Sequence, residues 1–229
     1  MATSAAQQLV GPIVGSRVPD EFAANPARGR FNSAFFHVMG GFIDFNMRKR
    51  KRTAFADLPT DVVEVGSGVG ANLRYLPAGA RLTAIEPNPY MHKRLRRAAH
   101  KRRIELEIRS VLGERIDLPD ESTDTVISSL VLCTVSDPAA VLAEIKRILR
   151  PGGRFSFAEH VVARPRTMTR LLQRVLRRPW AWLFEGCSCE RDLTSLIRSA
   201  GFATVDITPY RIHSGLVPFN THIAGTAIT

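Results

Sequence analysis

Cysteine, acidic residues and long apolar runs are all scarce in this chain. Its 229 residues include three cysteines, Cys133, Cys187 and Cys189, which provide neither a disulfide framework nor a zinc tetrad and favour a reducing, cytoplasmic location. No stretch approaches the ~18–20 apolar residues that span a bilayer. The N-terminus lacks a basic segment followed by an apolar run, so we expect no signal peptide.

The charge balance is strongly basic. The chain has 32 Lys and Arg residues against 21 Asp and Glu residues, which gives a net charge of +11. Such an excess favours anionic partners: nucleic acid, a phospholipid surface or an acidic small substrate. A basic surface that only keeps the protein soluble explains the composition equally well. Hydrophobic residues make up 45% of the chain, which suits one α/β domain with a full core.

Short apolar segments alternate with amphipathic ones from residue 61 onward, which is typical of parallel βαβ units. We expect strands at 61–65, 81–85, 104–108, 125–133 and 153–159, and helices at 89–103 and 138–149. Helices at 167–184 and 190–200 then precede two strands with no helix between them, at 203–212 and 222–229. The pattern therefore predicts a Rossmann-like α/β fold: a seven-stranded, mostly parallel sheet with a C-terminal antiparallel hairpin and helices on both faces.

The regions outside this alternation set the predicted domain organisation. Residues 1–30 mix small residues and proline without periodicity, so we interpret them as a loosely ordered arm. Residues 31–229 then form one domain. Within it, residues 31–56 are expected to be an N-terminal helical lid, and residues 164–189 a second helical lid inserted after the fifth strand.

The segment VVEVGSGVGA, at residues 62–71, reads as a strand running into a glycine turn. Glycines in such a turn let the backbone approach a nucleotide-like ligand closely. Glu86 ends the next strand, where its carboxylate can accept hydrogen bonds from both ribose hydroxyls of an adenosine. A dinucleotide and S-adenosylmethionine both fit this spacing. The Arg150–Gly153 turn before the fifth strand and the C-terminal hairpin favour the methyl donor over NAD.

Longer stretches carry a family resemblance. They are VVEVGSGVGANLRYLP, LTAIEPNP, STDTVISSLVLCTVSDPAAVLAEIKRILRPGG, RFSFAEH and THIAGTAIT. Together they resemble the class I S-adenosylmethionine-dependent methyltransferases of the ubiquinone-biosynthesis type, from about residue 31 to residue 229. EPNPYMHKRL, SLVLCTV, LRPGG, FAEHV and WLFEGCSCER are similar to segments of the animal alkyl-thiol S-methyltransferases. The resemblance implies S-adenosyl-L-methionine as cofactor and S-adenosyl-L-homocysteine as product.

The resemblance also implies a cofactor site. Glu64 and the glycine turn would hold the methionine part and the ribose, and Glu86 the ribose hydroxyls. The loop after the third strand would flank the adenine, and the end of the fourth strand would face the sulfonium. The residues implied are Glu64, Gly66, Ser67, Gly68, Gly70, Asn72, Glu86, Pro87, Asn88, Gly113, Glu114, Ser129 and Leu130.

On the acceptor side, His160 is the candidate catalytic residue, as a base or as a residue that shapes the substrate site. Glu159 and His160 leave opposite faces of an extended strand, so we do not expect them to pair. The predicted substrate pocket consists of Phe36, His37, Glu159, Trp182 and Cys187. We predict no metal, because the Cys187–Cys189 pair has no further cysteine nearby in the sequence.

The sequence thus predicts methyl transfer by in-line displacement to a small, apolar acceptor. A thiol is favoured, since it ionises readily, and a phenol or amine is the alternative. The alternative interpretations are a phospholipid or other membrane-associated N- or O-methyltransferase, a nucleic-acid methyltransferase and a non-catalytic adenosine-ligand binding protein. Against nucleic acid, enzymes that methylate base amino groups usually have an Asn/Asp-Pro-Pro-aromatic motif at the fourth strand, and this chain has Ser128-Ser129-Leu130-Val131 there.

The basic amphipathic helix at 167–184 has two interpretations. Its apolar side can cover the substrate site as a lid, together with the segment 31–45, or the helix can lie on an anionic membrane. We favour the lid, because the insertion point after the fifth strand faces the ligand edge of the sheet. The sequence does not indicate an oligomeric state.

Overall fold

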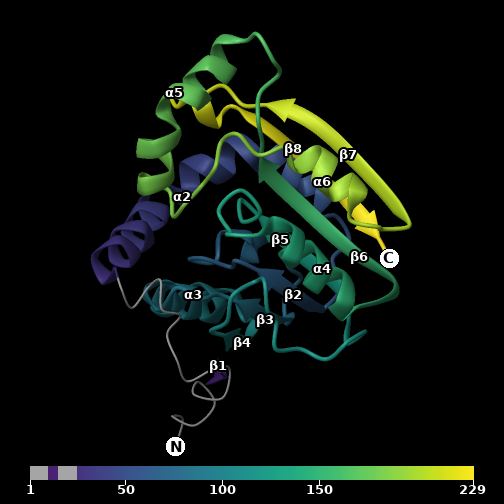
Figure 1. Ribbon diagram of the computed structural model, residues 1–229. Coiled ribbons are helices and arrows are strands. Elements are labelled where there is room, and N and C mark those ends of the chain that lie inside the picture. Colours follow the sequence, from purple (N-terminus) through teal and green to yellow (C-terminus); the bar gives the residue numbers. More distant parts are fainter. Residues whose placement is uncertain (1–9, 15–24) are drawn as a thin grey trace, which may run out of the picture.

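The computed structural model describes residues 10–14 and 25–229 (Figure 1). Its strands are β1 (Val10–Val14), β2 (Asp61–Val65), β3 (Arg81–Ile85), β4 (Glu105–Arg109), β5 (Thr123–Ser129), β6 (Leu149–His160), β7 (Thr204–Arg211) and β8 (Thr221–Ile228). Its α-helices are α2 (Pro26–Ala54), α3 (Pro89–Arg102), α4 (Pro138–Ile148), α5 (Met168–Leu183) and α6 (Leu193–Ser199). Two short 3₁₀ helices, η1 (Ala71–Tyr75) and η2 (Val217–Phe219), complete the elements.

All described strands belong to one sheet, in the order β1-β4-β3-β2-β5-β6-β8-β7. Every neighbouring pair from β1 to β6 is parallel, while β6-β8 and β8-β7 are antiparallel. This confirms the predicted fold class. The short strand β1 extends the predicted sheet at its β4 edge.

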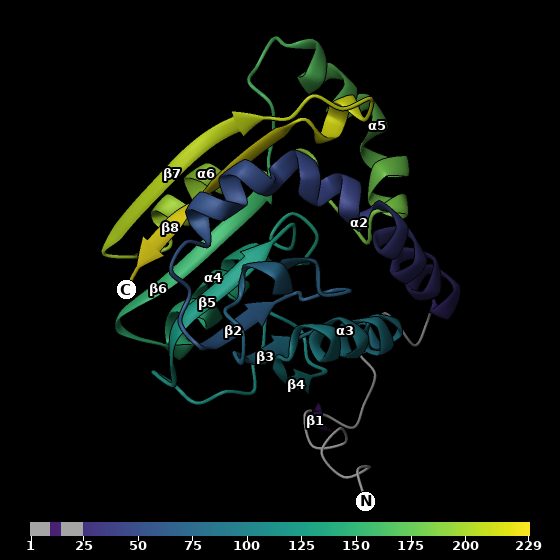
Figure 2. The ribbon, with the colours of Figure 1, turned by 180° about the vertical axis from the view of Figure 1, so that it is seen from behind.

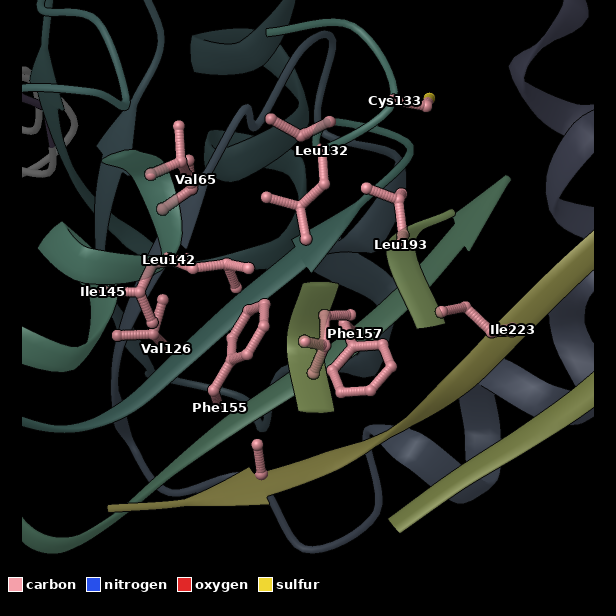
Figure 3. Packing of buried hydrophobic residues seen from close by; sticks show 14 of the residues in the cluster. Val65, Val126, Leu132, Cys133, Leu142, Ile145, Phe155, Phe157, Leu193 and Ile223 are labelled. Carbon is pink, nitrogen blue, oxygen red and sulfur yellow. The ribbon is translucent and has the colours of Figure 1, made fainter. Parts of the chain in front are cut away.

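Helices cover both faces of the sheet because its central strands are apolar on both sides. On one face, α4 and α6 bury residues such as Ile145 and Leu193 against Phe155 of β6 (Figure 3). On the other, α2 and α3 pack against Val62 and its neighbours. Figure 2 shows α2 crossing in front of β6 and β8. This layering leaves the carboxyl ends of the parallel strands open to a ligand.

Helix starts that adjoin these strand ends are set by local capping. Asn88 caps α3, where its side chain accepts a hydrogen bond from the N–H of Tyr90, and Pro89 occupies the first turn. Asp137 caps α4 in the same way, followed by Pro138. An Asn or Asp cap followed by proline fixes the first helical residue, so the preceding loops are held at the ligand edge.

The predicted fourth strand was too long at its C-terminal end. β5 stops at Ser129, whereas the apolar run predicted a strand to Cys133. Leu130 has a φ of +61°, which ends the extended backbone. The N–H of Val131 then donates to the buried carboxylate of Glu159, which also accepts a 2.7 Å hydrogen bond from Ser128 Oγ. The residues after β5 therefore form a loop at the ligand edge.

The predicted N-terminal arm, residues 1–30, lies for the most part outside the described residues. Of its described parts, Val10–Val14 forms β1 and Pro26–Arg30 begins α2. The division into an arm, a domain and two lids stays a prediction.

Candidate active site

A polar cleft lies at the carboxyl ends of β2, β3 and β5, beneath α2. Most of the residues that the sequence assigned to the cofactor line it. They are Gly66, Ser67, Gly68, Asn72, Glu86, Pro87, Gly113, Glu114, Ser129 and Leu130. Three others, Glu64, Gly70 and Asn88, lie behind this lining and support it. We call this space the polar cleft.

The glycine turn after β2 forms one wall of the polar cleft. Gly66, Gly68 and Gly70 all have positive φ, which L-residues rarely adopt. A Cβ atom on Gly66 would collide with the side chain of Val131, whereas one on Gly68 would point into open space. The turn is thus closed on its protein side and accessible on its cleft side, as close approach of a ligand to the backbone requires.

Glu86, at the end of β3, has its carboxylate held by two backbone groups. The N–H of Gly68 donates to Oε2 at 2.7 Å, and the N–H of Asn88 donates to Oε1 at 2.9 Å. Burial, with the negative charge of Glu185 second, raises the pKa of Glu86 to about 8. A carboxylate positioned in this way can accept further hydrogen bonds from the two hydroxyls of a ribose.

Behind the glycine turn, a buried polar network connects β2 to α2. Asn72 donates to Glu64 Oε1 at 2.7 Å, and Lys51 Nζ donates to Asn72 Oδ1 at 2.9 Å. Lys51 also lies 3.9 Å from Asp44, which pairs with Arg74 at 2.8 Å. Burial lowers the pKa of Lys51 to about 8, although the charge of Asp44 opposes the shift. The network fixes α2 over the cleft.

Within the described residues, Glu64 Oε2 is buried and has no hydrogen-bond partner. Burial raises the pKa of this carboxyl group. A buried acceptor without a donor is costly, and an ammonium group at the adjoining cleft would supply one. These features fit S-adenosylmethionine. The unpaired oxygen of Glu64 suits its amino group, Glu86 suits its ribose hydroxyls, and the glycine turn lets the cofactor lie close to the backbone between them.

The remaining cofactor candidates shape the ends of the cleft. Asn88, besides capping α3, donates to Glu185 at 2.7 Å. Glu114 accepts hydrogen bonds from the N–H groups of Ser136 and Asp137, so it holds the start of α4 at the cleft rim. Leu130, with its left-handed backbone, lies between this cleft and a second cavity.

The second cavity is apolar and shares four lining residues with the polar cleft: Phe36, Ile43, Leu130 and Thr134. We call it the apolar cavity. Its walls come from α2, from the loop after β5, from the end of α5 and from η2. The other lining residues are Phe35, Met39, Phe42, Cys133, Trp180, Phe184, Cys187, Leu216 and Phe219. No charged side chain lines it among the described residues.

The structure separates the five residues predicted for the substrate pocket. Phe36 and Cys187 line the apolar cavity. His37 is exposed on α2, and the Trp182 side chain is 68% exposed on α5, while Trp180 faces the cavity in its place. Glu159 is buried below the loop after β5 and lines neither space. Its side chain and that of His160 make separate contacts, in agreement with the alternation of a strand.

His160 lies directly behind Cys187. Its Nδ1 is 3.6 Å from Cys187 Sγ, and its Nε2 is 2.7 Å from the carbonyl oxygen of Pro218. Cys133 completes the group: the thiols of Cys133 and Cys187 influence each other, so that the pKa of Cys187 is lowered and that of Cys133 is raised. His160 itself does not line either space, so Cys187 stands between this imidazole and the apolar cavity.

The fold and the polar cleft define a class of enzyme, the S-adenosylmethionine-dependent methyltransferases. A family model described as "Methyltransferase domain" matches residues 63–157. Human thiol S-methyltransferase TMT1A is 35% identical over 193 residues, which cover 80% of this chain and 79% of that protein. The chain therefore belongs to the class I S-adenosylmethionine-dependent methyltransferases related to the thiol S-methyltransferases, and its cofactor is S-adenosylmethionine.

Solved structures support the fold. A possible histamine N-methyltransferase from Thermotoga maritima matches with a TM-score of 0.54 and 18% identity, covering 84% of this chain and 99% of that one. The Haemonchus contortus phospholethanolamine N-methyltransferase 2, in complex with S-adenosylhomocysteine, matches with a TM-score of 0.65 and 13% identity. That match covers 94% of this chain and 61% of the other. At such identities the likeness concerns the fold alone.

Sequence reasoning missed Lys51 and Trp180. Lys51 lies in the basic run 48–52, and nothing local distinguishes the one buried cation from its exposed neighbours. Trp180 shares a helical face with Thr169 and Gln173. Both are buried but polar, so the hydropathy pattern of α5 does not indicate that this face is the buried one. The four-residue spacing between Trp180 and Phe184 was the available signal, because it places the two aromatic side chains on one face of the helix.

Proposed function

We propose that this protein transfers the methyl group of S-adenosylmethionine to the sulfur of a small, apolar thiol. The single observation that carries the proposal is the apolar cavity, which opens from the polar cleft at Phe36, Ile43, Leu130 and Thr134. Its lining offers aromatic and aliphatic surface and two cysteines, and no charged side chain among the described residues. A thiol suits such a lining, because its low intrinsic pKa demands less of a base than a phenol or an amine.

S-adenosylmethionine supplies a methyl group that its sulfonium already activates. The chain's own residues have to orient the acceptor and exclude water from the reacting atoms. Phe36 and Leu130 lie between the two spaces and exclude water there, while Trp180 and Phe184 hold the apolar body of the acceptor. Positioning of this kind can supply on the order of 7–11 kcal/mol.

A matched acceptor series tests the proposal. Thiophenol, phenol and aniline share one ring and differ in the nucleophilic atom, so their initial rates at saturating S-adenosylmethionine compare chemistry at nearly constant shape. We expect the thioether to form fastest, with S-adenosylhomocysteine released in equal amount. Faster methylation of the oxygen or nitrogen compound would contradict thiol preference and leave the enzyme class intact.

We also propose that an anionic membrane surface is a peripheral partner. Met168, Leu171, Val175 and Trp182 of α5 are exposed, and so are Phe31, Val38, Phe42 and Phe45 of α2. Both views show α5 beside the N-terminal half of α2, and Arg28 of α2 donates to the carbonyl of Ala181 (Figures 1 and 2). Exposed arginines on these helices, among them Arg48, Arg174 and Arg178, complement phospholipid charge.

Vesicle co-sedimentation tests this partner. We expect binding to vesicles of phosphatidylglycerol and phosphatidylcholine that weakens with salt, and little binding to phosphatidylcholine alone. Leu171→Ser with Val175→Ser should lose the apolar part of the binding without affecting S-adenosylhomocysteine affinity. Equal sedimentation of the double variant would refute a role for this face. No described helix is both long enough and apolar enough to cross a membrane.

A further inference from the structure

Three potential metal ligands converge beside the apolar cavity from three separate parts of the chain. Cys133 lies in the loop after β5, at the end of the packed core in Figure 3, His160 ends β6, and Cys187 follows α5. Their donor atoms all lie within 4.8 Å of one another. The side chains are almost completely buried, with exposures of 1%, 0% and 5%. The sequence analysis predicted no metal because the Cys187–Cys189 pair has no further cysteine nearby in the sequence, whereas the fold brings Cys133 and His160 next to Cys187.

The surroundings of His160 orient it as a ligand. Its Nε2 hydrogen bonds to the carbonyl oxygen of Pro218 at 2.7 Å, and Gln173 Nε2 donates to the same oxygen at 3.0 Å. A ring N–H donated to a backbone carbonyl leaves the lone pair of the neutral imidazole on Nδ1, which is the atom facing Cys187. Histidines that bind metals typically have this second hydrogen bond.

The donor set indicates which cation fits. Two cysteine sulfurs and one imidazole nitrogen suit Zn²⁺, which takes four ligands and binds sulfur at about 2.3 Å. Three protein ligands leave one position open, as in catalytic zinc sites. Cys133 and Cys187 line the apolar cavity, while His160 lies behind them. The open position therefore faces the space that the acceptor occupies.

We propose that Cys133, His160 and Cys187 bind a Zn²⁺ ion whose open position takes the sulfur of the thiol acceptor. The metal site rests on geometry alone, and its role toward the acceptor rests on the proposed thiol methylation. The acceptor S–H loses its proton to solvent as its sulfur joins the ion. A sulfur lone pair then forms the new S–CH₃ bond, while the C–S⁺ bond breaks and leaves its electron pair on the departing sulfur.

Charge makes this arrangement favourable in an apolar cavity. Two cysteine thiolates neutralise Zn²⁺, so a bound acceptor thiolate gives the site one net negative charge. That charge disappears when the thiolate meets the positive sulfonium, because both products are neutral thioethers at the reacting sulfurs. A cavity without charged side chains favours a step in which opposite charges cancel. The ion also selects sulfur over phenol oxygen among acceptors of equal size.

Cobalt titration of the full chain, reduced and stripped with a chelator, tests the site directly. We expect one Co²⁺ per chain and a sulfur-to-cobalt charge-transfer band. The band should disappear in Cys133→Ser, Cys187→Ser and His160→Ala, each checked for folding by S-adenosylhomocysteine binding. Cys189→Ser is the matched control: Cys189 is buried and close in sequence, but its sulfur hydrogen bonds to the carbonyl of Gln173. It should keep the band.

Adding thiophenol should shift the cobalt spectrum, and adding phenol should not. A band that survives all three ligand variants, or no binding of Co²⁺ to the reduced chain, overturns the metal site. The metal site is also overturned if Cys133 and Cys187 only form a disulfide and bind no Co²⁺ after reduction. Full thiol methylation by the stripped enzyme removes the metal from the reaction but leaves thiol methylation standing. Metal binding with a thiophenol shift but no methyl transfer sustains the site and defeats the proposed function.

Discussion

The carboxylate of Glu86 accepts a 2.7 Å hydrogen bond from the backbone N–H of Gly68, which joins the ends of two neighbouring parallel strands across the polar cleft. Glu86→Ala should therefore weaken S-adenosylhomocysteine binding by about 2–4 kcal/mol, or roughly 30- to 1,000-fold, since two charge-assisted hydrogen bonds to the ribose are lost. Calorimetry measures the change. Glu105→Ala, at an exposed position of β4, is the control. Equal affinities for the two variants would show that the ribose is bound elsewhere.

Cofactor binding should depend on pH through the same carboxyl group. Burial raises the pKa of Glu86 to about 8, and ribose hydroxyls donate to its ionised form. Affinity for S-adenosylhomocysteine should then rise up to about tenfold per pH unit below about pH 8 and level off above it. Glu86→Gln should abolish this slope. A titration that is flat in the wild-type protein would contradict the assignment.

The sign is opposite for the stability of the unliganded protein. A carboxyl group whose pKa is higher when folded holds its proton more tightly in the native state. Its contribution to the free energy of unfolding should therefore be complete below the ordinary carboxyl pKa and be lost as the pH rises toward about 8. Urea unfolding of the wild-type and Glu86→Gln proteins across this range measures the effect. Because glutamine resembles the protonated carboxyl group, the two free energies of unfolding should differ by a constant amount at low pH, and the wild-type protein should lose stability relative to the variant toward pH 8.

The two tryptophans of α5 should respond differently to substitution. Trp180 is 7% exposed and lines the apolar cavity, whereas Trp182 is 68% exposed. Trp180→Ala should raise the KM for apolar acceptors and lower the free energy of unfolding by about 3–5 kcal/mol. Trp180→Phe retains an aromatic ring and should show the KM effect with less loss of stability. Trp182→Ala should leave the KM unchanged; a raised KM there would place the acceptor on the outer side of the helix.

Two glycines of the turn form another matched pair. Gly66 and Gly68 both have positive φ, but only at Gly66 would a Cβ collide with another side chain, that of Val131. Gly66→Ala should lower the free energy of unfolding well beyond the roughly 1–2 kcal/mol of left-handed strain expected for Gly68→Ala. Gly68→Ala places its methyl group in the cleft, so it should instead weaken S-adenosylhomocysteine binding. Thermal unfolding and calorimetry on both variants would separate these effects, and a reversed order would contradict the turn geometry.

Local signals were sufficient to predict most of the sheet. β2 and β3 match their predicted bounds because Gly66 and Pro87 closely follow short apolar runs. The end of β5 was not predictable in this way. The apolar residues continue to Cys133, and the strand stops because Leu130 turns left-handed while Glu159, distant in sequence, accepts the N–H of Val131. The end of this strand depends on a tertiary contact, so the local pattern of apolar residues does not predict it.

The lining of the polar cleft was more predictable than that of the apolar cavity for the same reason. Backbone turns and strand ends form the polar cleft, and both have local sequence signals, as Gly68 and Glu86 illustrate. Side chains from α2 and α5 line the apolar cavity. A small error in the predicted phase of either helix therefore assigns an exposed side chain to the cavity and a cavity-lining one to the surface. His37 and Trp182 were placed inward by that error, and each has a cavity-lining residue one or two positions away, Phe36 and Trp180.

Helix α2 contributes Phe36 and Ile43 to the polar cleft and to the apolar cavity at once. Under the proposed function, this one helix would enclose both the cofactor and the acceptor, so neither compartment could open by a movement of α2 independently of the other. Occupancy of one compartment should hold the shared wall in place for the second, which makes the two binding events cooperative. Turnover would then be governed by the rate at which this wall releases spent cofactor and methylated product together.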